Sequence, residues 1–149
     1  MPDNVTNNST AEGRGVFFVL SQSNLARRAP IVLRLGLAAL FLWFGVSQVL
    51  SPESWMAWVP EWTNDVLGVS VPHIVLMNGT FEVVGGVLLA LGLWTRWVAL
   101  ALSLHLFFIA FEVGYNDIGV RDFTLAVSTL AVSFFGPDTC SLDNKIARK

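Results

Sequence analysis

Charged residues and cysteines are both scarce in this sequence. Lys, Arg, Asp and Glu make up only 13% of the 149 residues, whereas 54% are hydrophobic, and the mean hydropathy is +0.60. Soluble globular domains carry about 25% charged residues, so this composition excludes an ordinary soluble domain and indicates a membrane protein. The single cysteine, Cys140, excludes an internal disulfide, a CxxC redox pair and cysteine ligation of zinc or an iron–sulfur cluster within the chain.

The sequence also lacks the charge and the spacing that two further classes of site require. Its 9 basic and 11 acidic residues give a net charge of -2, which leaves no basic surface for a nucleic acid. The two histidines, His73 and His105, lie on different segments and show no metal-ligand spacing. We therefore expect neither a nucleic-acid partner nor a metal site.

Hydrophobic residues gather in four runs that are long enough to cross a bilayer as helices, which takes about 20 residues for about 30 Å of hydrocarbon. The expected spans are residues 31–50, 74–94, 97–114 and 118–136. The fourth is the weakest, because it reaches span length only by including Arg121 and Asp122 at its start. The predicted fold class is all-α, an integral membrane four-helix bundle covering residues 30–137.

Basic residues are distributed unevenly between the two ends of these spans. The outer loop of residues 51–72 contains no Lys or Arg, whereas most basic residues flank the other ends of the spans. The positive-inside rule therefore predicts an integral plasma membrane protein with both termini in the cytoplasm. The cytoplasmic tails are residues 1–29, expected to be flexible with an interfacial segment at residues 16–20, and residues 138–149.

The outer loop of residues 51–72 has a pattern of its own. Pro52 and Pro60 each stand where a first helical turn can begin, and Ser51 can cap the first piece. The tryptophans of the loop recur at helical spacing, at Trp55, Trp58 and Trp62. The pattern predicts an interfacial, proline-broken helix, which serves either as an aromatic belt that anchors the bundle or as a lid over a cavity that opens outward.

Two ionisable residues are expected near the middle of the membrane. Glu82 falls about halfway along the second span and His105 about halfway along the third. Glu82 shares a helix face with small residues, namely Gly79, Gly86 and Ala90; the corresponding stripe of the third span is Val98, Ala101, His105, Phe108 and Glu112. If the stripes face each other, the carboxylate and the imidazole meet, either as a structural pair or as part of a proton or quinone site.

Arg34 completes the candidate quinone or proton site of Arg34, Glu82 and His105. It lies about a turn inside the cytoplasmic end of the first span, so its side chain can reach the boundary. Arg34 either anchors to headgroups, Asp138 or Asp143, or holds an anionic group of a ligand bound from the inner leaflet.

A second set of polar side chains is expected at the outer ends of the spans, and we define it as the outer polar cluster: Gln48, Glu112, Arg121 and Asp122. We expect Glu112, Arg121 and Asp122 to form a salt-bridge network that joins the third and fourth spans. A binding site is the alternative interpretation.

The order of several short motifs resembles that of the DoxX family of small four-span membrane proteins. The motifs are Arg34-Leu35-Gly36, the run from Glu82 to Gly92, Thr95-Arg96, Arg121-Asp122 and Ser141-Leu142-Asp143. Family members usually carry a lysine near the end of the first span, where this chain has Gln48.

This resemblance carries expectations about function. The better-described relatives are the DoxD-type membrane subunit of a thiosulfate:quinone oxidoreductase and partners in redox or thiol-stress complexes. The resemblance implies a membrane subunit or partner of such a system in a prokaryotic inner membrane, with a quinone as candidate cofactor and a soluble redox enzyme or another membrane subunit as partner in the lipid bilayer. The alternative is a non-catalytic scaffold, or a bundle that conducts protons or a small solute.

Overall fold

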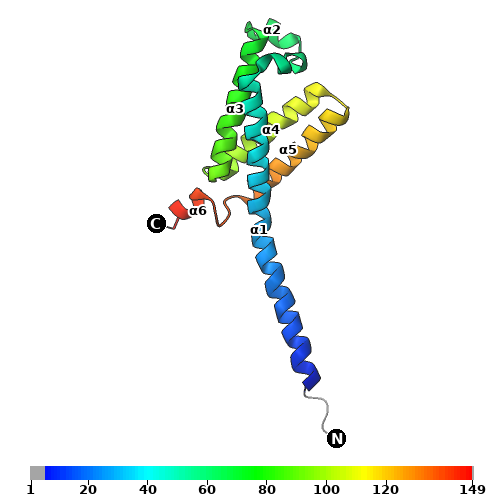
Figure 1. Cartoon of the computed structure of the whole chain (residues 1–149), viewed down its shortest axis with the longest axis vertical. Coiled ribbons are helices and arrows are strands. Elements are labelled where there is room, and N and C mark those ends of the chain that lie inside the picture. The colour runs from blue at the N-terminus through cyan, green and yellow to red at the C-terminus, as the bar shows by residue number, and fades with distance from the viewer. Residues whose placement is uncertain (1–5, 149) are drawn as a thin grey trace.

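The computed structural model consists of helices joined by short turns (Figure 1). It describes the backbone of residues 6–148 and the side chains of residues 25–66 and 68–148. The helices are α1 (Thr6–Leu50), the 3-10 helix η1 (Pro52–Trp58), α2 (Trp62–Leu67), α3 (Val71–Leu91), α4 (Thr95–Val113), α5 (Asp117–Phe135) and α6 (Leu142–Ile146). Residues 6–148 contain no strand and include four helices that are long and apolar enough to cross a membrane, which confirms the predicted all-α membrane bundle.

The candidate membrane spans are Leu25–Leu50 of α1 and the whole of α3, α4 and α5. α3 begins at Val71, earlier than the predicted span, because Pro72 suits a first helical turn that needs no N–H partner. It ends at Leu91, because the next residue, Gly92, adopts a left-handed conformation with φ 67°. Pro72 and Gly92 therefore set the two ends of α3, and the length of a hydrophobic run does not reveal them.

α1 is longer than the predicted first span. It begins at Thr6, so residues 6–29 continue the helix where the sequence led us to expect a flexible tail. An existing helix grows at little cost, because each added residue gains a hydrogen bond without a new nucleus. The expected interfacial segment at residues 16–20 lies in this part of α1, where side chains are outside the described residues.

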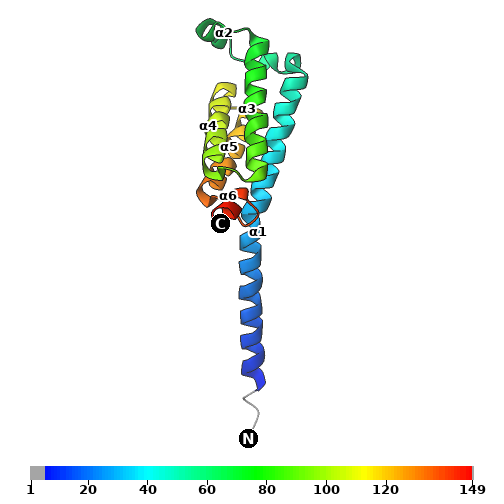
Figure 2. The same ribbon diagram turned by 90° about the vertical axis from the view of Figure 1, so that its left-hand side faces the viewer.

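The four long helices pack as two antiparallel pairs, α1 with α3 and α4 with α5, and most contacts lie within the pairs. Figure 1 shows that the pairs meet near the end that carries α6 and diverge toward the end that carries η1 and α2. In Figure 2, turned by 90°, the N-terminal part of α1 projects beyond the bundle. The divergence leaves η1 and α2 above the space between the two pairs.

Glycines allow α1 and α3 to approach each other closely. A Cβ atom on Gly45 would lie only 2.7 Å from the carbonyl oxygen of Gly79. A Cβ atom on Gly86 would lie 3.0 Å from Cγ of Leu42. The small-residue stripe that contains Glu82 therefore faces α1 and makes the tight half of the bundle.

The stripe predicted for the third span is wrong in part. His105 is half-buried, but Ala101 and Phe108 are exposed. α4 instead buries a different set of residues: Thr95, Ala99, Leu102, Ser103, Leu106 and Ala110. The Ser103 hydroxyl donates to the carbonyl of Ala126 on α5 at 2.9 Å. The reason for the difference is that α4 packs mainly on α5, the next helix in the chain, rather than on α3.

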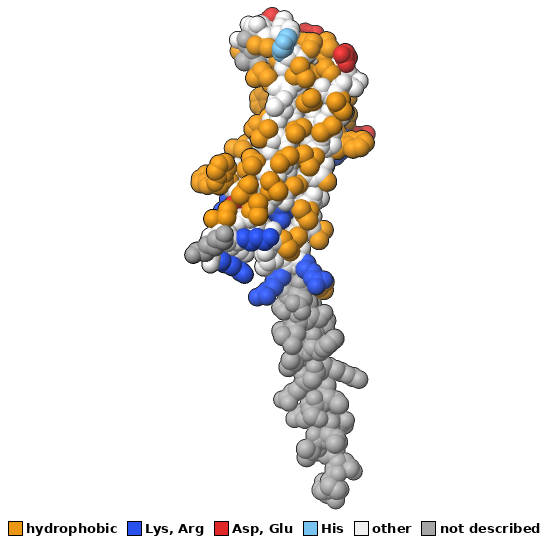
Figure 3. Space-filling model, turned by 60° about the vertical axis from the view of Figure 1, so that its left-hand side comes forward, with side chains coloured by type: hydrophobic (Ala, Val, Ile, Leu, Met, Phe, Trp, Pro, Cys, Tyr) orange, Lys and Arg blue, Asp and Glu red, His pale blue; other side chains and the backbone are white. Residues whose placement is uncertain are grey.

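Large apolar side chains cover the outside of the bundle. Figure 3 shows them along one face, with Lys and Arg gathered at the lower end of the described part and Asp, Glu and His at the upper end. Among the most exposed are Trp43, Trp97, Phe111 and Phe134. An apolar surface of this extent is stable in contact with lipid rather than with water, which agrees with a membrane protein.

Candidate functional site

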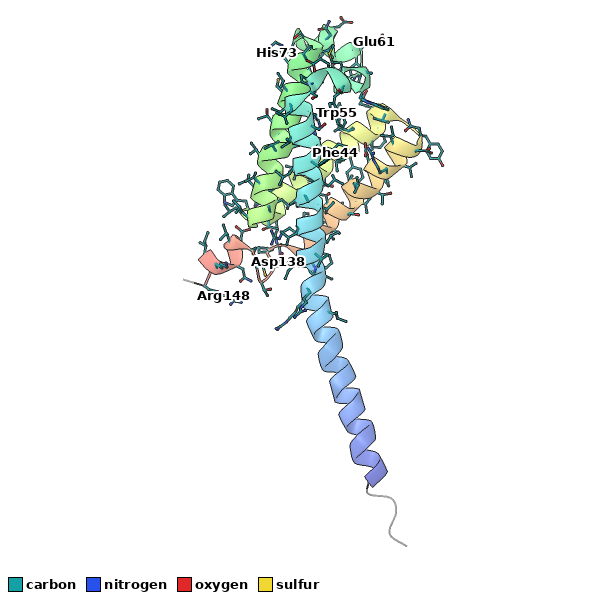
Figure 4. All side chains as sticks on the ribbon, in the orientation of Figure 1. Phe44, Trp55, Glu61, His73, Asp138 and Arg148 are labelled. Atoms are coloured by element: carbon teal, nitrogen blue, oxygen red, sulfur yellow. The ribbon has the colours of Figure 1, made fainter. Side chains whose placement is uncertain are left out.

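A cavity of about 450 Å³ lies between the two helix pairs, at the end where they diverge. Residues from α1, α3, α4, α5 and the outer loop line it, and its aromatic lining consists of Phe41, Phe44, Trp55, Trp58 and Phe108. Figure 4 shows Phe44 and Trp55 where α1 faces the α4–α5 pair. Small-molecule sites have this volume and this mostly apolar wall with a few polar groups. The cavity can therefore take a small, largely apolar organic molecule.

Glu82 is the centre of a buried polar cluster in the cavity wall, which we call the Glu82 cluster: Gln48, Asn78, Glu82 and His105. Nε2 of Gln48 donates to Oε2 of Glu82 at 2.9 Å, and Nδ2 of Asn78 donates to Oε1 at 3.2 Å. Asn78 also donates to Oε1 of Gln48 at 2.6 Å. Both carboxylate oxygens therefore accept a hydrogen bond, as a buried acid requires.

His105 reaches the same carboxylate from α4, so the predicted contact between Glu82 and His105 is confirmed. Its Nε2 atom lies 3.5 Å from Oε1 of Glu82. This atom is buried and makes no hydrogen bond within the described side chains, because the approach is too long or misaligned. The ring packs on Phe81 with 4.8 Å between ring centroids, which holds the imidazole in place.

The first prediction concerns the Glu82 cluster. Glu82→Gln should change the free energy of unfolding little, because an amide oxygen can still accept from Gln48 or Asn78. Glu82→Leu removes the acceptor of the Gln48 amide and one of the two acceptors of the Asn78 amide, and should cost about 1–2 kcal/mol. A double-mutant cycle, measured by unfolding in SDS followed by circular dichroism, should give a larger coupling of Glu82 with Gln48 than with His105. Thr80→Val, at an exposed position of the same helix, is the control for the general effect of a substitution on α3. If Glu82→Gln and Glu82→Leu cost the same relative to this control, the prediction is contradicted.

The outer polar cluster is arranged differently from the predicted network. Arg121 donates from Nε to Asp122 at 2.8 Å, within α5, and its guanidinium lies over the ring of Phe44, 5.5 Å from the centroid. Glu112 instead accepts a hydrogen bond from Trp62 Nε1 of α2 at 3.0 Å. The expected salt-bridge network between the third and fourth spans is therefore wrong for these side chains. The reason is that Arg121 already contacts the adjacent Asp122 carboxylate on α5 and the ring face of Phe44 on α1, so its guanidinium is not directed toward Glu112.

The outer loop forms two short helical pieces, η1 and α2, separated at Val59 and Pro60, as the prolines predicted. The side chain of Ser51 makes no capping hydrogen bond, contrary to expectation, because its backbone conformation is not that of a cap. Trp55 packs edge-on against Phe44 with 5.6 Å between centroids, and its Nε1 donates to Ser47 at 3.2 Å. The loop therefore covers the cavity, as expected of a lid.

Arg34 lies at the opposite end of the bundle, away from the cavity. Its side chain is 2% exposed. Nε donates to Oδ2 of Asp138 at 2.7 Å, and Nη1 donates to the carbonyl oxygens of Leu89 and Ala90 at 2.5 and 2.7 Å. The carbonyls belong to the last turn of α3, where a cation is favourable. These contacts match the anchoring alternative, with Asp138 as the partner.

Asp143 joins the C-terminal segment to the start of α4. It accepts hydrogen bonds from the backbone of Trp94 and Thr95, both at 2.8 Å, and from the Thr95 hydroxyl at 2.9 Å. Burial tends to raise the pKa of Asp143, but these hydrogen bonds, with a smaller effect of the Arg34 charge, lower the pKa below its ordinary value. The contacts also hold Trp94 in a left-handed conformation, φ 48°, which is uncommon for a bulky residue.

The second prediction follows from this lowered pKa. A carboxyl group with a depressed pKa in the folded state stabilises the fold above its unfolded pKa, near 3.8, and loses that effect as the pH falls through the folded pKa. Asp143→Asn should therefore cost about 1 kcal/mol at pH 7, and the difference from wild type should shrink below about pH 4. Melting temperatures in detergent across this range test it. A difference that does not change with pH, or one matched by exposed Asp65→Asn, would oppose it.

The structure divides the predicted site residues into two places. Glu82, His105 and Gln48 meet at the cavity, which Glu112, Arg121 and Asp122 also line, whereas Arg34 lies at the other end. Asn78 was missed by the sequence reasoning. Its position four residues before Glu82, on the same face of a helix, was the available signal.

Comparison with known proteins adds one finding. The model of the DoxX family matches residues 29–114 of the chain, from within the first turns of the first candidate span to the end of α4. The searches of curated proteins and of solved structures gave no match. The matched segment is more than half of the chain and contains most of the motifs noted above, including Arg34 and Glu82. The chain therefore belongs to the DoxX family.

Proposed function

We propose that this DoxX protein binds a quinone in its cavity and acts as the membrane subunit or membrane partner of a quinone-linked or thiol-stress oxidoreductase system. The observation that carries the proposal is the cavity of about 450 Å³ with aromatic walls and one buried polar cluster. A quinone headgroup is flat, apolar on its faces and polar only at its oxygens. Aromatic side chains pack well on such a ring, and a few hydrogen-bonding groups orient it.

The proposed partner follows from what this chain contains. It has a single cysteine, Cys140, so it cannot form a dithiol redox pair by itself. Cys140 is exposed and follows α5, and its backbone N–H donates to Asp138, the partner of Arg34, at the end of the bundle opposite the cavity. Electrons for the bound quinone would therefore come from another protein, either a soluble redox enzyme or a second membrane subunit.

Conduction of protons or small solutes is the weaker alternative. Apolar side chains make up most of the bundle between the cavity and the Arg34–Asp138 pair, and those that are buried include Leu37, Ala38, Leu89, Leu102 and Val132. The hydroxyls of Ser103 and Thr129, buried among them, already donate to backbone carbonyls of α5. A proton or ion crossing this layer would lose its polar partners. A closed inner half favours a binding chamber over a continuous path.

The test is to purify the protein in mild detergent, extract it with organic solvent and quantify quinones by mass spectrometry. Wild type should retain quinone, Ile74→Trp should retain much less because it fills the cavity wall, and Val84→Trp should match wild type because Val84 is exposed on the same helix. Absence of quinone in wild type, or equal retention in both variants, would overturn the proposal. Proteins that co-purify with wild type identify the redox partner.

The proposed orientation places both termini in the cytoplasm. Its support is the basic end of the described part, which Figure 3 shows. The basic residues in the segments at this end are Arg27, Arg28, Arg96, Lys145 and Arg148.

The third prediction tests this orientation. In a Cys140→Ser background, Asp65→Cys and Asp117→Cys should react with a membrane-impermeant thiol reagent in intact cells, whereas Ala147→Cys should not. Labelling of Ala147→Cys alone would reverse the orientation.

A further inference from the structure

Basic side chains gather at the end of the bundle that carries α6, opposite the cavity (Figure 3). Residues 25–36, 89–98 and 135–148 meet at this end, and they contain no acid other than Asp138 and Asp143. Asp138 pairs with Arg34, and Asp143 accepts from the backbone at the start of α4. The remaining basic residues are exposed and form no salt bridge with a described side chain: Arg27, Arg28, Arg96, Lys145 and Arg148. The fold therefore leaves a positive charge at this end without a counter-charge.

Arg96 differs from the others because it is seated between two helices. A Cβ atom on Gly136 would lie 2.5 Å from Nε of Arg96 and 3.0 Å from Nη2, so the guanidinium fills the space beside this glycine, just after α5. The C-terminal end of a helix is a favourable place for a cation. No described side chain or carbonyl accepts a hydrogen bond from this guanidinium. Arg96 is thus held in place with its donors unused.

Exposed aromatic side chains lie beside this seat on both helices. Trp94 and Trp97 flank Arg96 in the chain, and Phe134 and Phe135 precede Gly136; all four are exposed. Tryptophan is enriched where the hydrocarbon of a bilayer meets the headgroups. A cation next to such an apolar surface matches a molecule with an anionic head and apolar chains.

We propose that the α6 end of the bundle binds an anionic phospholipid and that the guanidinium of Arg96 holds its phosphate. A guanidinium can donate two parallel hydrogen bonds to phosphate oxygens. The exposed aromatic side chains contact the acyl chains, and the other basic residues of this end add a long-range attraction. The lipid site is independent of the proposed quinone function, because the cavity lies at the other end of the bundle.

Two other anionic partners fit this surface less well. A free phosphate has no acyl chains, and an exposed ion pair with one arginine contributes little in water. An acidic surface of a soluble protein would also be attracted to the basic residues. Trp97 and Phe135, however, belong to candidate membrane spans, so lipid rather than a soluble protein reaches them. The combination of charge and apolar surface therefore favours a phospholipid.

The test is native mass spectrometry of the full chain in mild detergent, titrated with dioleoylphosphatidylglycerol or dioleoylphosphatidylcholine, which share their acyl chains. Wild type should bind the anionic lipid about tenfold more tightly, and the preference should shrink as salt is added, because exposed charges are screened. Arg96→Gln should weaken phosphatidylglycerol binding about fivefold and leave phosphatidylcholine binding unchanged. Arg96→Lys keeps the charge but loses the planar fork, so its affinity should lie between those of wild type and Arg96→Gln.

Two control variants separate the Arg96 site from the overall charge of the protein. Arg148→Gln removes the same charge at the same end, but Arg148 lies beyond α6 (Figure 4), so this variant should weaken binding less than Arg96→Gln. Asp65→Asn makes the net charge more positive at the opposite end and should leave binding unchanged. Thermal unfolding in phosphatidylcholine nanodiscs shows whether each variant is folded. If Arg96→Gln does not fold, Arg96→Lys and the salt dependence of wild type decide.

Each unexpected outcome has a definite meaning. Equal binding of the two lipids by wild type, or a preference that salt does not reduce, overturns the proposal. Equal losses in Arg96→Gln and Arg148→Gln overturn Arg96 as the residue that holds the phosphate. Displacement of phosphatidylglycerol by inorganic phosphate at a similar concentration indicates a site for a free anion, and displacement by poly-L-glutamate at a lower charge concentration indicates an acidic protein partner. Either displacement overturns the lipid as the occupant.

Discussion

Asp138→Ala should lower the free energy of unfolding by about 3–5 kcal/mol, the largest effect that we expect from a single substitution in this protein. Asp138 is the partner of the Arg34 guanidinium, which is almost fully buried. Removing the carboxylate leaves a cation enclosed by protein, with no hydrogen-bond acceptor but the carbonyls of Leu89 and Ala90 and with the Asp143 carboxylate as a weaker, more distant counter-charge. Asp138 also accepts from the backbone of Cys140, so the turn after α5 loses a contact too.

The measurement is unfolding in SDS, followed by circular dichroism. The double variant Arg34→Met/Asp138→Asn should recover most of the loss, because it removes the buried charge together with its partner. Asp65→Ala, at an exposed acid of α2, should have little effect. If Asp138→Ala costs no more than Asp65→Ala, the Arg34–Asp138 pair does not stabilise the end of the bundle that carries α6.

Gly45→Ala should cost about 1–3 kcal/mol, although alanine is the better helix former. The added Cβ atom would lie 2.7 Å from the carbonyl oxygen of Gly79 and 2.8 Å from the backbone nitrogen of Val83. Backbone atoms of a packed helix cannot move aside as the end of a side chain can, so α1 and α3 must separate.

A matched control lies on the same helix. Gly36 has no atom within 4 Å of the position of an added Cβ, so Gly36→Ala should be neutral or stabilise by about 0.5–1 kcal/mol through helix propensity. Both variants are compared by unfolding in SDS and by the yield of folded protein. Equal effects at Gly36 and Gly45 would mean that the close approach of α1 and α3 is not what stabilises this half of the bundle.

The residues of the site could be predicted from the sequence, but their arrangement only in part: the contact of Glu82 with His105 was predicted, whereas the separation of Arg34 from that pair was not. The cost of an ionisable group in hydrocarbon identifies Arg34, Glu82 and His105 without any structure. Their grouping depends on which helices are neighbours, and that placed Glu82 beside Gln48 and left Arg34 with Asp138. Helical spacing gives a residue its face but does not say which helix that face meets.

The sequence by itself determined the class of this protein, the number of its membrane helices and the proline-broken outer loop. These features depend on local properties, since apolar length decides whether a helix can span and prolines decide where a short helix can start. Only the tertiary structure decided that the helices pair as α1 with α3 and α4 with α5, and that the pairs diverge over a cavity. The physical reason is that pairing depends on the fit of whole helix surfaces. Glycines allow α1 and α3 to approach closely, α4 packs on α5, and aromatic side chains from both pairs line the cavity where the pairs diverge.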